Sequence, residues 1–500
     1  ELLIAGFVLV MSVITIQNYN SHSFMFDELY TLSFVSKKIS FADMMHIFMT
    51  DEVTNPPLYN IILYFWYRIV PAKEAWLLLP NLIFFIIALF FLGALIKSVS
   101  GKIEYTLLIM MIAWVNHNTF NFMLYYLRSY SLAFMLSAMT LYLYYKADKS
   151  DKISDCVKLG IVMTCVALTH YYGIFLVSAF GIYTFLQIIL KKKSWKHLVA
   201  YLIAGSVTGI YLLIATAHRT KSLSSFWGNT PDFNSILDVL HVYFVDKDVV
   251  VVFALVLIGS VVAQIFSSND SLDFTEKNLW RICFVSSIFV ISVVFIYGRY
   301  INPEGSIFIN KYFLVIYPEV LILFVLSIDF ILKTIDTCFV SKIHISDEIK
   351  KSLRDIECIG ICIIYLLLQF RWNIVGRMEN VFELPPKNRS MAEYILSNSS
   401  DSTALLVYRD HGSQWDVVHY PVDGFREFYL GDRSNDIEII DEISDAKKYD
   451  KICLWYTMFT IYETYDREKN KVAEHVLKDM SGFHFVEAYP DAGLLIFEKN

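Results

Sequence analysis

Long apolar runs recur through most of the first 370 residues, and they restrict the possible folds more than any other feature of this sequence. A helix needs roughly 20 apolar residues to cross a bilayer, with about 17 as a lower limit. Eleven runs approach that length: 2–17, 75–96, 104–117, 123–145, 154–170, 172–190, 197–217, 248–267, 278–298, 312–333 and 355–370. Only 18% of the residues are charged, against about 25% in a soluble domain. We therefore predict an α-helical polytopic membrane protein with about eleven transmembrane helices.

Charge and cysteine usage exclude several other classes of protein. The net charge is −7, so the chain lacks the basic excess that nucleic-acid binding requires. The seven cysteines are scattered, and no pair has zinc-site spacing in a polar loop, so neither a zinc site nor a disulfide framework is expected. The first apolar run is not followed by a small-residue cleavage site, and we interpret it as a retained span.

Lysine-rich loops predict the orientation of the spans. The segments 97–102, 146–152 and 191–197 read KSVSGK, KADKSDK and KKKSWKH. Short loops rich in lysine stay in the cytoplasm. All three lie on one side only if the short run 57–70, which contains Arg68, does not cross the membrane. The chain is then a multi-pass protein of the cell membrane, with a cytoplasmic N-terminus and an extracytoplasmic C-terminus.

The C-terminal part of the chain has a different composition. Polar and charged residues return after residue 370, between short segments that have the patterns of buried strands or of helices. The expected strands are 404–410, 451–457 and 492–500, and the expected helices are 390–396 and 471–480. We predict a transmembrane module over residues 1–370, including an outer loop 18–74 with juxtamembrane helices, and a small extracytoplasmic α/β domain over residues 371–500.

The predicted outer loop 18–74 contains two groups of residues suited to chemistry. Asp27 and Glu28 follow the first span, at the boundary between water and lipid. Partial desolvation there makes a carboxylate more basic, which suits proton abstraction from a hydroxyl group. The second group is NPPLYN, residues 55–60, in which the double proline stiffens the backbone and starts a helix at Leu58.

Two further stretches stand at predicted outer ends of spans. Residues 125–132 read YYLRSYSL and residues 168–173 read LTHYYG. Arg128 and His170 are the polar groups within them. An arginine that snorkels to the headgroups and a belt of interfacial tyrosines would give the same pattern in any membrane protein. The common sidedness of Asp27, Asn55, Arg128 and His170 favours a shared cavity, because it follows from the lysine positions alone.

The order of these motifs resembles the GT-C superfamily of membrane glycosyltransferases. The most similar branch is the bacterial one related to protein O-mannosyltransferases and lipid A aminoarabinose transferases. In that branch an acidic residue follows the first span, and an (H/N)PPL-Y segment follows about 25–30 residues later. Here Asp27 precedes Asn55 by 28 positions. The resemblance extends from residue 1 to about residue 330.

This resemblance implies an enzyme that transfers a hexose or pentose from a polyprenyl-phosphate donor to an acceptor hydroxyl on the extracytoplasmic face, with inversion. The acceptor would be a glycan, a lipid or a protein. Asp27 would be the general base, and Glu28 would hold Asp27 or contact the acceptor. The resemblance also implies further site residues. The donor phosphate would be bound by Arg128, His170, Lys311, Arg299 and Tyr130, and the substrate-binding loop would comprise Asn55, Pro56, Tyr59 and Tyr171.

No cofactor is predicted from the sequence. Some members of the family carry a second acidic residue just after the arginine that corresponds to Arg128, whereas Tyr130 and Ser131 stand there in this chain. A divalent metal therefore has no support from ligand spacing.

Two other functions remain open from the sequence. A lipid or sugar transporter or flippase would place ionisable residues within its spans and often shows repeated halves. The spans of this chain are nearly free of charge, which favours an interfacial enzyme. An assembly scaffold acting through the C-terminal domain is the second alternative, because that domain carries no recognisable catalytic motif.

Overall fold

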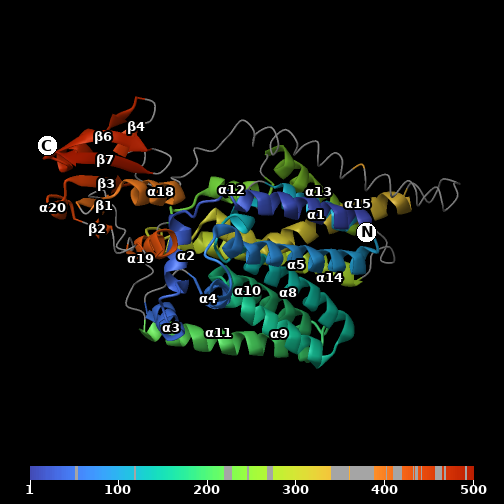
Figure 1. Cartoon of the computed structure of the whole chain (residues 1–500). Coiled ribbons are helices and arrows are strands. Elements are labelled where there is room, and N and C mark those ends of the chain that lie inside the picture. Colours follow the sequence, from blue (N-terminus) through green and yellow to red (C-terminus); the bar gives the residue numbers. More distant parts are fainter. Residues whose placement is uncertain are drawn as a thin grey trace. The chain divides into compact units, whose positions relative to one another are not determined.

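A computed structural model gives the architecture of the chain (Figure 1). It describes residues 1–50, 55–116, 120–218, 228–244, 247–266, 274–338, 360, 388–400, 402–408, 419–431, 433, 437–440, 442–456, 464–466, 469–489 and 493–500. The predicted span 355–370 lies outside the described residues apart from Gly360. The chain divides into two compact units, and each is described by itself.

The helical unit comprises Glu1–Gln17, Met45–Tyr59 and Leu78–Glu379. The mixed unit comprises Asn18–Met44, Asn60–Leu77 and Asn380–Asn500. Most of the predicted outer loop 18–74 thus groups with the C-terminal residues. The division of the chain into two domains near residue 370 remains a prediction.

Ten of the predicted spans correspond to helices within the described residues. They are α1 (Leu2–Tyr19), α5 (Glu74–Ser100), α6 (Glu104–Val115), α8 (Tyr130–Ser150), α9 (Ile153–Ala167), α10 (Tyr171–Ile189), α11 (Leu198–His218), α13 (Lys247–Phe266), α14 (Phe274–Ile296) and α15 (Tyr317–Cys338). A π-helix, η1 (Phe120–Leu124), precedes α8, and a 3₁₀-helix, η5 (Asn310–Ile316), leads into α15. Helix α12 (Phe233–Phe244) lies between α11 and α13 in the chain. The predicted polytopic helical fold is confirmed.

Seven stretches of the described residues are long and apolar enough to cross a membrane. They lie on α1, α5, α10, α11, α13, α14 and α15. The other three predicted spans fall short for separate reasons. Helices α6 and α9 have 12 and 15 residues. Helix α8 is long enough, but its last turns carry Lys146, Asp148 and Lys149, which lower its hydropathy.

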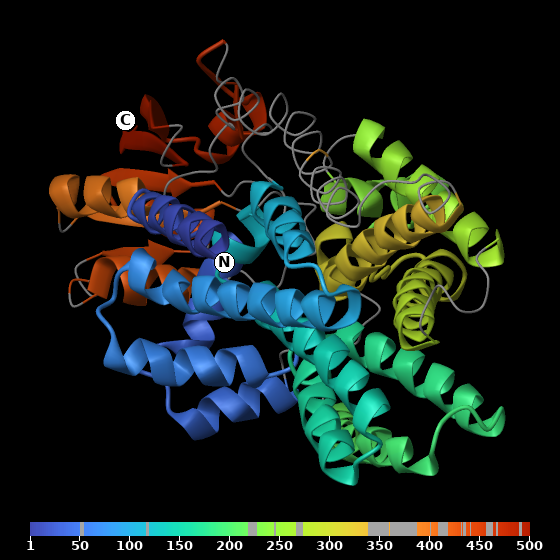
Figure 2. The ribbon, with the colours of Figure 1, turned by 90° about the vertical axis from the view of Figure 1, so that its right-hand side faces the viewer.

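Close packing of the spanning helices relies on small residues. Helix α9 packs between α8 and α11, as the view in Figure 2 shows. A side chain at Gly160 would overlap the backbone of Ala200 on α11, and one at Gly93 on α5 would overlap Thr106 on α6. Glycine lets helix backbones approach closely where lipid gives no hydrophobic drive to associate.

The lysine-rich loops meet at one end of the helical unit. Lys196 lies 2.8 Å from Asp151 and joins the segments 191–197 and 146–152. Lys193 lies 2.9 Å from Asp148, whose carboxylate also accepts a hydrogen bond from Asn278 on α14. These contacts tie two of the three loops to the start of α14.

The third loop joins through a chain of ion pairs. Lys102 lies 3.0 Å from the fully buried carboxylate of Asp329 on α15. Lys333 lies 2.9 Å from Asp329 and 2.8 Å from Glu276 on α14. All three lysine-rich segments therefore occupy one end of the helical unit, which we call the lysine end. The common side that the sequence predicts for them is present in the structure, and its assignment to the cytoplasm remains a prediction.

Short helices of the mixed unit come from both ends of the chain. They include α2 (Phe26–Val35), α18 (Asn388–Asn398), α19 (His419–Phe425), α20 (Ile443–Ala446) and α22 (Glu474–Asp479), with η8 (Arg426–Leu430) following α19. Helices α3 (Phe41–Thr50) and α4 (Leu58–Ile69) begin or end in this unit. The 12 residues of α4 extend about 18 Å, which is less than the roughly 30 Å hydrocarbon core of a bilayer.

The contacts of Arg68 explain how an arginine is accommodated in the apolar helix α4. Its guanidinium donates to the carbonyl oxygens of Ser36 at 3.1 Å and Ile39 at 2.8 Å, and it lies 3.2 Å from the ring centroid of Tyr64. The carbonyl groups after the end of α2 thus receive donors. Arg68 fixes the link between α2 and α3 against α4.

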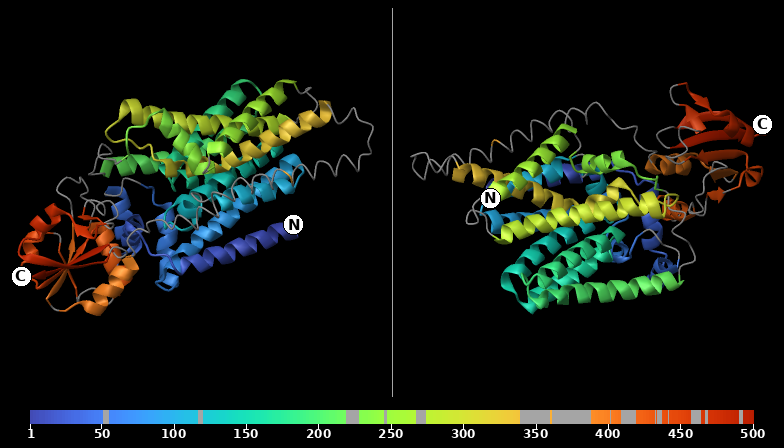
Figure 3. Two further views of the ribbon diagram at one scale, coloured as in Figure 1. Left: turned by 90° about the horizontal axis from the view of Figure 1, so that it is seen from above. Right: turned by 180° about the vertical axis from the view of Figure 1, so that it is seen from behind.

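The mixed unit contains a five-stranded sheet in the order β2-β1-β3-β7-β6. Figure 3 shows this sheet in orange and red. The strands are β1 (Thr403–Val407), β2 (Glu438–Ile440), β3 (Lys451–Trp455), β6 (Phe483–Tyr489) and β7 (Leu494–Lys499). Strands β2, β1 and β3 pair in parallel, and β3, β7 and β6 pair in antiparallel fashion. The apolar runs of β1 and β3 are buried along nearly their whole length, as parallel strands covered on both faces require.

The predicted elements of the C-terminal domain are largely confirmed. All three predicted strands are present as β1, β3 and β7, and the predicted helix 390–396 is α18. The predicted helix 471–480 is shorter. Lys471 and Val472 form the small strand β5 with β4 (Tyr465–Asp466), and only Glu474–Asp479 is helical.

Candidate functional site

Hydrogen bonds join three of the sequence motifs within the helical unit. The backbone N–H of Leu58, in NPPLYN, donates to the carbonyl of Leu168, in LTHYYG, at 3.0 Å. The hydroxyl of Tyr59 donates to the Asn81 side-chain oxygen at 3.2 Å. The Asn81 amide in turn donates to the carbonyl of Tyr126, in YYLRSYSL, at 2.8 Å. Segments from four parts of the chain are therefore held together.

Asn81 was not identified from the sequence. It lies in the first half of α5, directly after Pro80, and it is fully buried. An amide in an apolar helix costs free energy unless its donor and acceptor are both paired. Its position as a single polar residue in an apolar span is the signal that could have identified it.

Cations and aromatic rings cluster beside this junction. We call Tyr126, Arg128, Tyr130, His170, Lys311 and Tyr312 the cation–aromatic cluster. The rings of Tyr126 and Tyr130 stack with centroids 6.2 Å apart, and Tyr312 lies 6.2 Å from Tyr130 and 4.9 Å from His170. The Lys311 ammonium lies 5.0 Å from the centroid of Tyr126. Four predicted site residues, Arg128, Tyr130, His170 and Lys311, thus belong to one neighbourhood.

His170 is the N-cap of α10 and is only 3% exposed. Its Nδ1 accepts a hydrogen bond from the backbone N–H of Tyr172 at 3.2 Å. An imidazole that accepts at Nδ1 carries a proton on Nε2. That Nε2 makes no hydrogen bond within the part of the chain that the structure describes. A buried donor without an acceptor suits an anionic ligand such as a phosphate oxygen.

Arg128 is half-buried in the turn between η1 and α8. The turn is closed by its own backbone N–H, which donates to the carbonyl of Tyr126 at 2.7 Å. The guanidinium is close enough to His170 to interact with it electrostatically. Two positively polarised groups therefore face the same region.

The cluster lies at the end of the helical unit opposite to the lysine end. Helix α8 begins at Tyr130 and ends at Ser150, 21 residues or about 30 Å away, next to Asp148 and Asp151. Helix α9 runs in the reverse direction and ends before His170. Arg128, His170 and Lys311 thus share one end of the spans, as the sequence predicts from the lysine positions.

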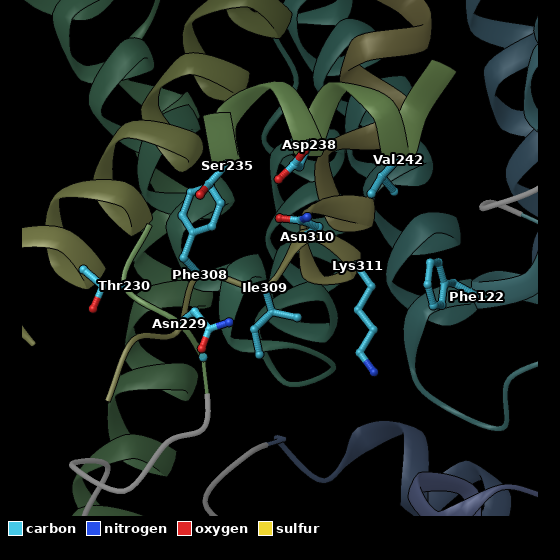
Figure 4. A pocket seen from close by; sticks show the side chains of 11 residues that line it. Phe122, Asn229, Thr230, Ser235, Asp238, Val242, Phe308, Ile309, Asn310 and Lys311 are labelled. Atoms are coloured by element: carbon cyan, nitrogen blue, oxygen red, sulfur yellow. The ribbon is translucent and has the colours of Figure 1, made fainter. Parts of the chain in front are cut away.

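A pocket of about 520 Å³ shares Lys311 with the cluster. Figure 4 shows the side chains that line this pocket. Its volume is typical of small-molecule sites. The lining residues are Phe122, Gly228, Asn229, Thr230, Ser235, Asp238, Val242, Phe308, Ile309, Asn310 and Lys311. Helix α12 provides one wall, and the segment before η5 provides another.

The predicted base lies in the mixed unit. Asp27 is half-buried in the first turn of α2, and its backbone carbonyl accepts a hydrogen bond from Thr31 at 3.2 Å. Glu28 is fully buried, and its carboxylate accepts from the N–H of Met25 at 2.8 Å and contacts His22 Nε2 at 3.1 Å. These contacts give Glu28 a structural role at the start of α2.

The segment that leads into α2 is fastened to the C-terminal residues of the mixed unit. Arg389 donates to Glu74 at 3.0 Å and to the carbonyls of Asn20 and His22 at 3.0 and 2.7 Å. We call these contacts the Arg389 lock. They use the whole planar fork of the guanidinium, which a lysine could not reproduce.

Tyr429 reinforces this lock. Its hydroxyl donates to Glu74 at 2.9 Å and accepts from the N–H of Phe24 at 2.8 Å. Burial and the nearby charge of Glu74 raise the pKa of Tyr429 well above its usual range. Helix α19 packs directly on α2, where a side chain at Gly424 would overlap the carbonyl of Leu29.

A solved structure has the same overall architecture. The crystal structure of ArnT from Cupriavidus metallidurans in the apo state aligns with a TM-score of 0.55 over 99% of this chain and 98% of ArnT, at 10% sequence identity. The chain has the GT-C fold. No protein-family model matches the sequence, and no curated protein matches it significantly.

The remaining predicted residues are placed as follows within this GT-C fold. Asn55, Pro56 and Tyr59 are buried at the motif junction, and Tyr171 is half-buried at the start of α10. Arg299 is exposed on the π-helix η4 (Tyr297–Ile301) and does not line the pocket. Among the residues that are described, no group of three His, Cys, Asp or Glu side chains is placed to hold a metal ion.

Proposed function

We propose that this protein is an integral membrane glycosyltransferase, which moves a sugar from a polyprenyl-phosphate donor to an acceptor hydroxyl on the extracytoplasmic face. The single observation that carries the proposal is the junction of NPPLYN, YYLRSYSL and LTHYYG at one end of a GT-C fold. Because the lysine-rich loops lie at the opposite end, this end faces away from the cytoplasm in the proposed orientation.

The cation–aromatic cluster is proposed to hold the donor phosphate. Negative charge grows on the phosphate oxygens as the bond to the anomeric carbon breaks, and fixed cations stabilise it. Arg128 can grip two oxygens with its planar fork, and Lys311 adds a compact charge. His170 Nε2 adds a neutral donor that is already buried. Polyprenyl tails are apolar, so the phosphate belongs at the water–lipid boundary.

Asp27 is proposed as the general base. In one displacement it takes the proton of the acceptor hydroxyl, whose oxygen forms the new bond to the anomeric carbon. The electron pair of the broken bond leaves with the lipid phosphate, and the anomeric centre inverts. Support comes from the order of Asp27 and NPPLYN in the sequence and from the half-buried position of Asp27. Tyr59 holds the backbone of the loop beside the cluster through its hydrogen bond to Asn81, and Asn55 is buried in the same loop.

Substitution of Asp27 by Asn tests the proposed reaction. We expect D27N to lose sugar transfer by at least about 100-fold, since a general base typically contributes 10²–10⁴-fold. Asp43 is an exposed carboxylate in the same segment, and D43N is the matched control. Transfer from polyprenyl-phosphate-linked sugars is measured with both proteins in liposomes, together with their thermal unfolding. A folded D27N protein with full transfer activity would exclude Asp27 as the base. A folded wild-type protein without transfer activity would favour a transporter or scaffold.

A further inference from the structure

The proposed function leaves most of the 520 Å³ pocket without a role, because phosphate binding uses only its Lys311 end. Asp238 on α12 points toward Asn310 in Figure 4, whereas the Lys311 side chain extends in another direction. The pocket therefore has a cationic end at Lys311 and a region lined by amides and a carboxylate. A ligand that fills it needs an anionic group and a neutral polar part.

Several polar groups of the pocket are available to a ligand. The side-chain amides of Asn229 and Asn310 make no hydrogen bond within the described residues, although both line the cavity. Within the described residues, the Asp238 carboxylate lies 3.9 Å from His241 Nδ1, which is beyond hydrogen-bond distance. Two amides and a carboxylate together offer both donors and acceptors, with an excess of acceptors.

Other polar residues of the pocket form hydrogen bonds within the protein, and these bonds fix the shape of the pocket wall. The Ser235 hydroxyl pairs with Asp232 at the start of α12, and Thr230 donates to the carbonyl of Pro303 at 2.8 Å. Gly228 pairs with Ser306 in an isolated antiparallel bridge, where a side chain would overlap the Ser306 carbonyl. The wall that carries Asn229 is therefore preorganised, which lowers the entropy cost of binding.

The apolar part of the lining is equally selective. Phe122, Val242, Phe308 and Ile309 face the same cavity. A sugar ring presents hydroxyl groups around its edge, which both donate and accept, and C–H groups on its faces. A lipid tail would leave the amides and Asp238 unpaired, and a second phosphate would be repelled by Asp238.

We propose that this pocket binds the sugar ring of the donor, with the ring hydroxyls on Asn229, Asp238 and Asn310 and the phosphate toward Lys311. This assignment rests on the proposed function and adds the residues that select the sugar. Ring hydroxyls belong to donor and acceptor sugars alike. Lys311 favours the donor, because only the donor sugar carries a phosphate at its anomeric carbon.

Binding to the full-length protein in nanodiscs tests the assignment without requiring turnover. The probes are inorganic phosphate, the 1-phosphates of glucose, mannose, galactose, N-acetylglucosamine and arabinose, and the methyl glycosides of the same sugars. We expect at least one sugar 1-phosphate to bind about tenfold or more tightly than inorganic phosphate. N310A and D238N should each weaken that probe by roughly 5- to 100-fold, as expected for lost ligand hydrogen bonds, and neither variant should weaken inorganic phosphate.

Two further variants complete the experiment. K311Q should weaken inorganic phosphate and the sugar 1-phosphate alike. Asn234 lies on α12 outside the pocket and donates weakly to Asp232, so N234A should bind every probe as the wild type does. An unfolding temperature equal to that of the wild type establishes that each variant is folded.

Three outcomes would overturn the assignment. In the first, no sugar 1-phosphate exceeds inorganic phosphate. In the second, the gain in affinity survives in both N310A and D238N. In the third, methyl glycosides bind as tightly as the 1-phosphates and K311Q has no effect, which would assign the pocket to the acceptor sugar instead of the donor sugar. Failure of the proposed reaction can be distinguished from failure of this assignment. If the wild-type protein transfers no sugar but still selects one sugar 1-phosphate, the assignment of the pocket stands and only the proposed transferase reaction is excluded.

Discussion

At the scale of single residues, Asn81 shows how one polar side chain can organise motifs that are far apart in the sequence. Its oxygen and its amide nitrogen serve Tyr59 and Tyr126 respectively, and both contacts are buried. The NPPLY segment therefore does not depend on its prolines alone for its position. Its backbone is held beside the cluster by a residue from α5.

Replacement of Asn81 by Leu is expected to destabilise the helical unit by about 1–3 kcal/mol, because it removes the buried hydrogen bonds with the Tyr59 hydroxyl and the Tyr126 carbonyl. Sugar transfer should fall as well, since the NPPLY segment loses its connection to Tyr126. Y59F removes only the hydroxyl and should cost less. Thermal unfolding of N81L, Y59F and the double variant gives their coupling, and strict additivity would mean that the Tyr59–Asn81 contact contributes nothing.

Tyr67 on α4 allows a test by pH. Burial, and secondarily the charge of Glu427, raise its pKa to about 12. The unfolded phenol titrates near pH 10, so the stability that its neutral form contributes is complete below about pH 10. It is lost as the pH rises toward 12. We expect thermal stability to fall more steeply between pH 10 and 12 in the wild type than in Y67F. Y300F is the control, because Tyr300 is exposed and its loss should leave the pH dependence of the wild type unchanged.

At the scale of elements, the sequence predicts the spanning helices well because hydropathy and length are local properties. The three strands of the C-terminal sheet are predicted for the same reason, since each is a short buried apolar run. Lys471 and Val472 were assigned to a helix and form a strand, because pairing with β4 outweighs the local pattern.

The candidate site is predicted only in part. Arg128, Tyr130, His170 and Lys311 were identified and are neighbours in the structure. Asn81 was missed because its partners are far away in sequence. The pocket residues on α12 were missed because nothing in the segment 233–244 departs from an ordinary amphipathic helix. Contacts such as those of residues 20–29 with Arg389, Gly424 and Tyr429 leave no periodic signal in either segment.

The Arg389 lock gives a prediction for the elements that surround α2. R389A should destabilise the mixed unit by about 2 kcal/mol, a typical value for hydrogen bonds that involve charged groups. R389K should recover only part of this, because one ammonium cannot reach Glu74 and two carbonyls together. K478A, on the exposed face of α22, is the control. An R389K protein with the unfolding temperature of the wild type would show that charge alone matters.

At the scale of the whole molecule, the helical unit has two chemically different ends. One end is held by ion pairs among Lys102, Asp329, Lys333 and Glu276, and the other carries the motif junction and the pocket. Each of α8, α9 and α15 contributes to both ends. Rigid helices that are fixed at the lysine end therefore also fix the spacing of the residues at the site.

The ion pairs at the lysine end are expected to matter in proportion to their burial. D329N should cost about 3–5 kcal/mol, because it removes the buried partner of two lysines. Lys97 and Glu1 form an exposed pair at the same end, and K97Q should leave unfolding unchanged within about 0.5 kcal/mol. Equal unfolding temperatures for the two variants would contradict this ranking.

The mixed unit has a consequence for biosynthesis, because its pieces are translated far apart in time. Helix α2 leaves the ribosome some 400 residues before Tyr429, which is roughly 20–80 s at common rates of elongation. During that interval the apolar face that later receives α19 has no intramolecular partner. A chain that is interrupted late in translation would therefore contain α2 and the spanning helices but lack the helix that packs on α2.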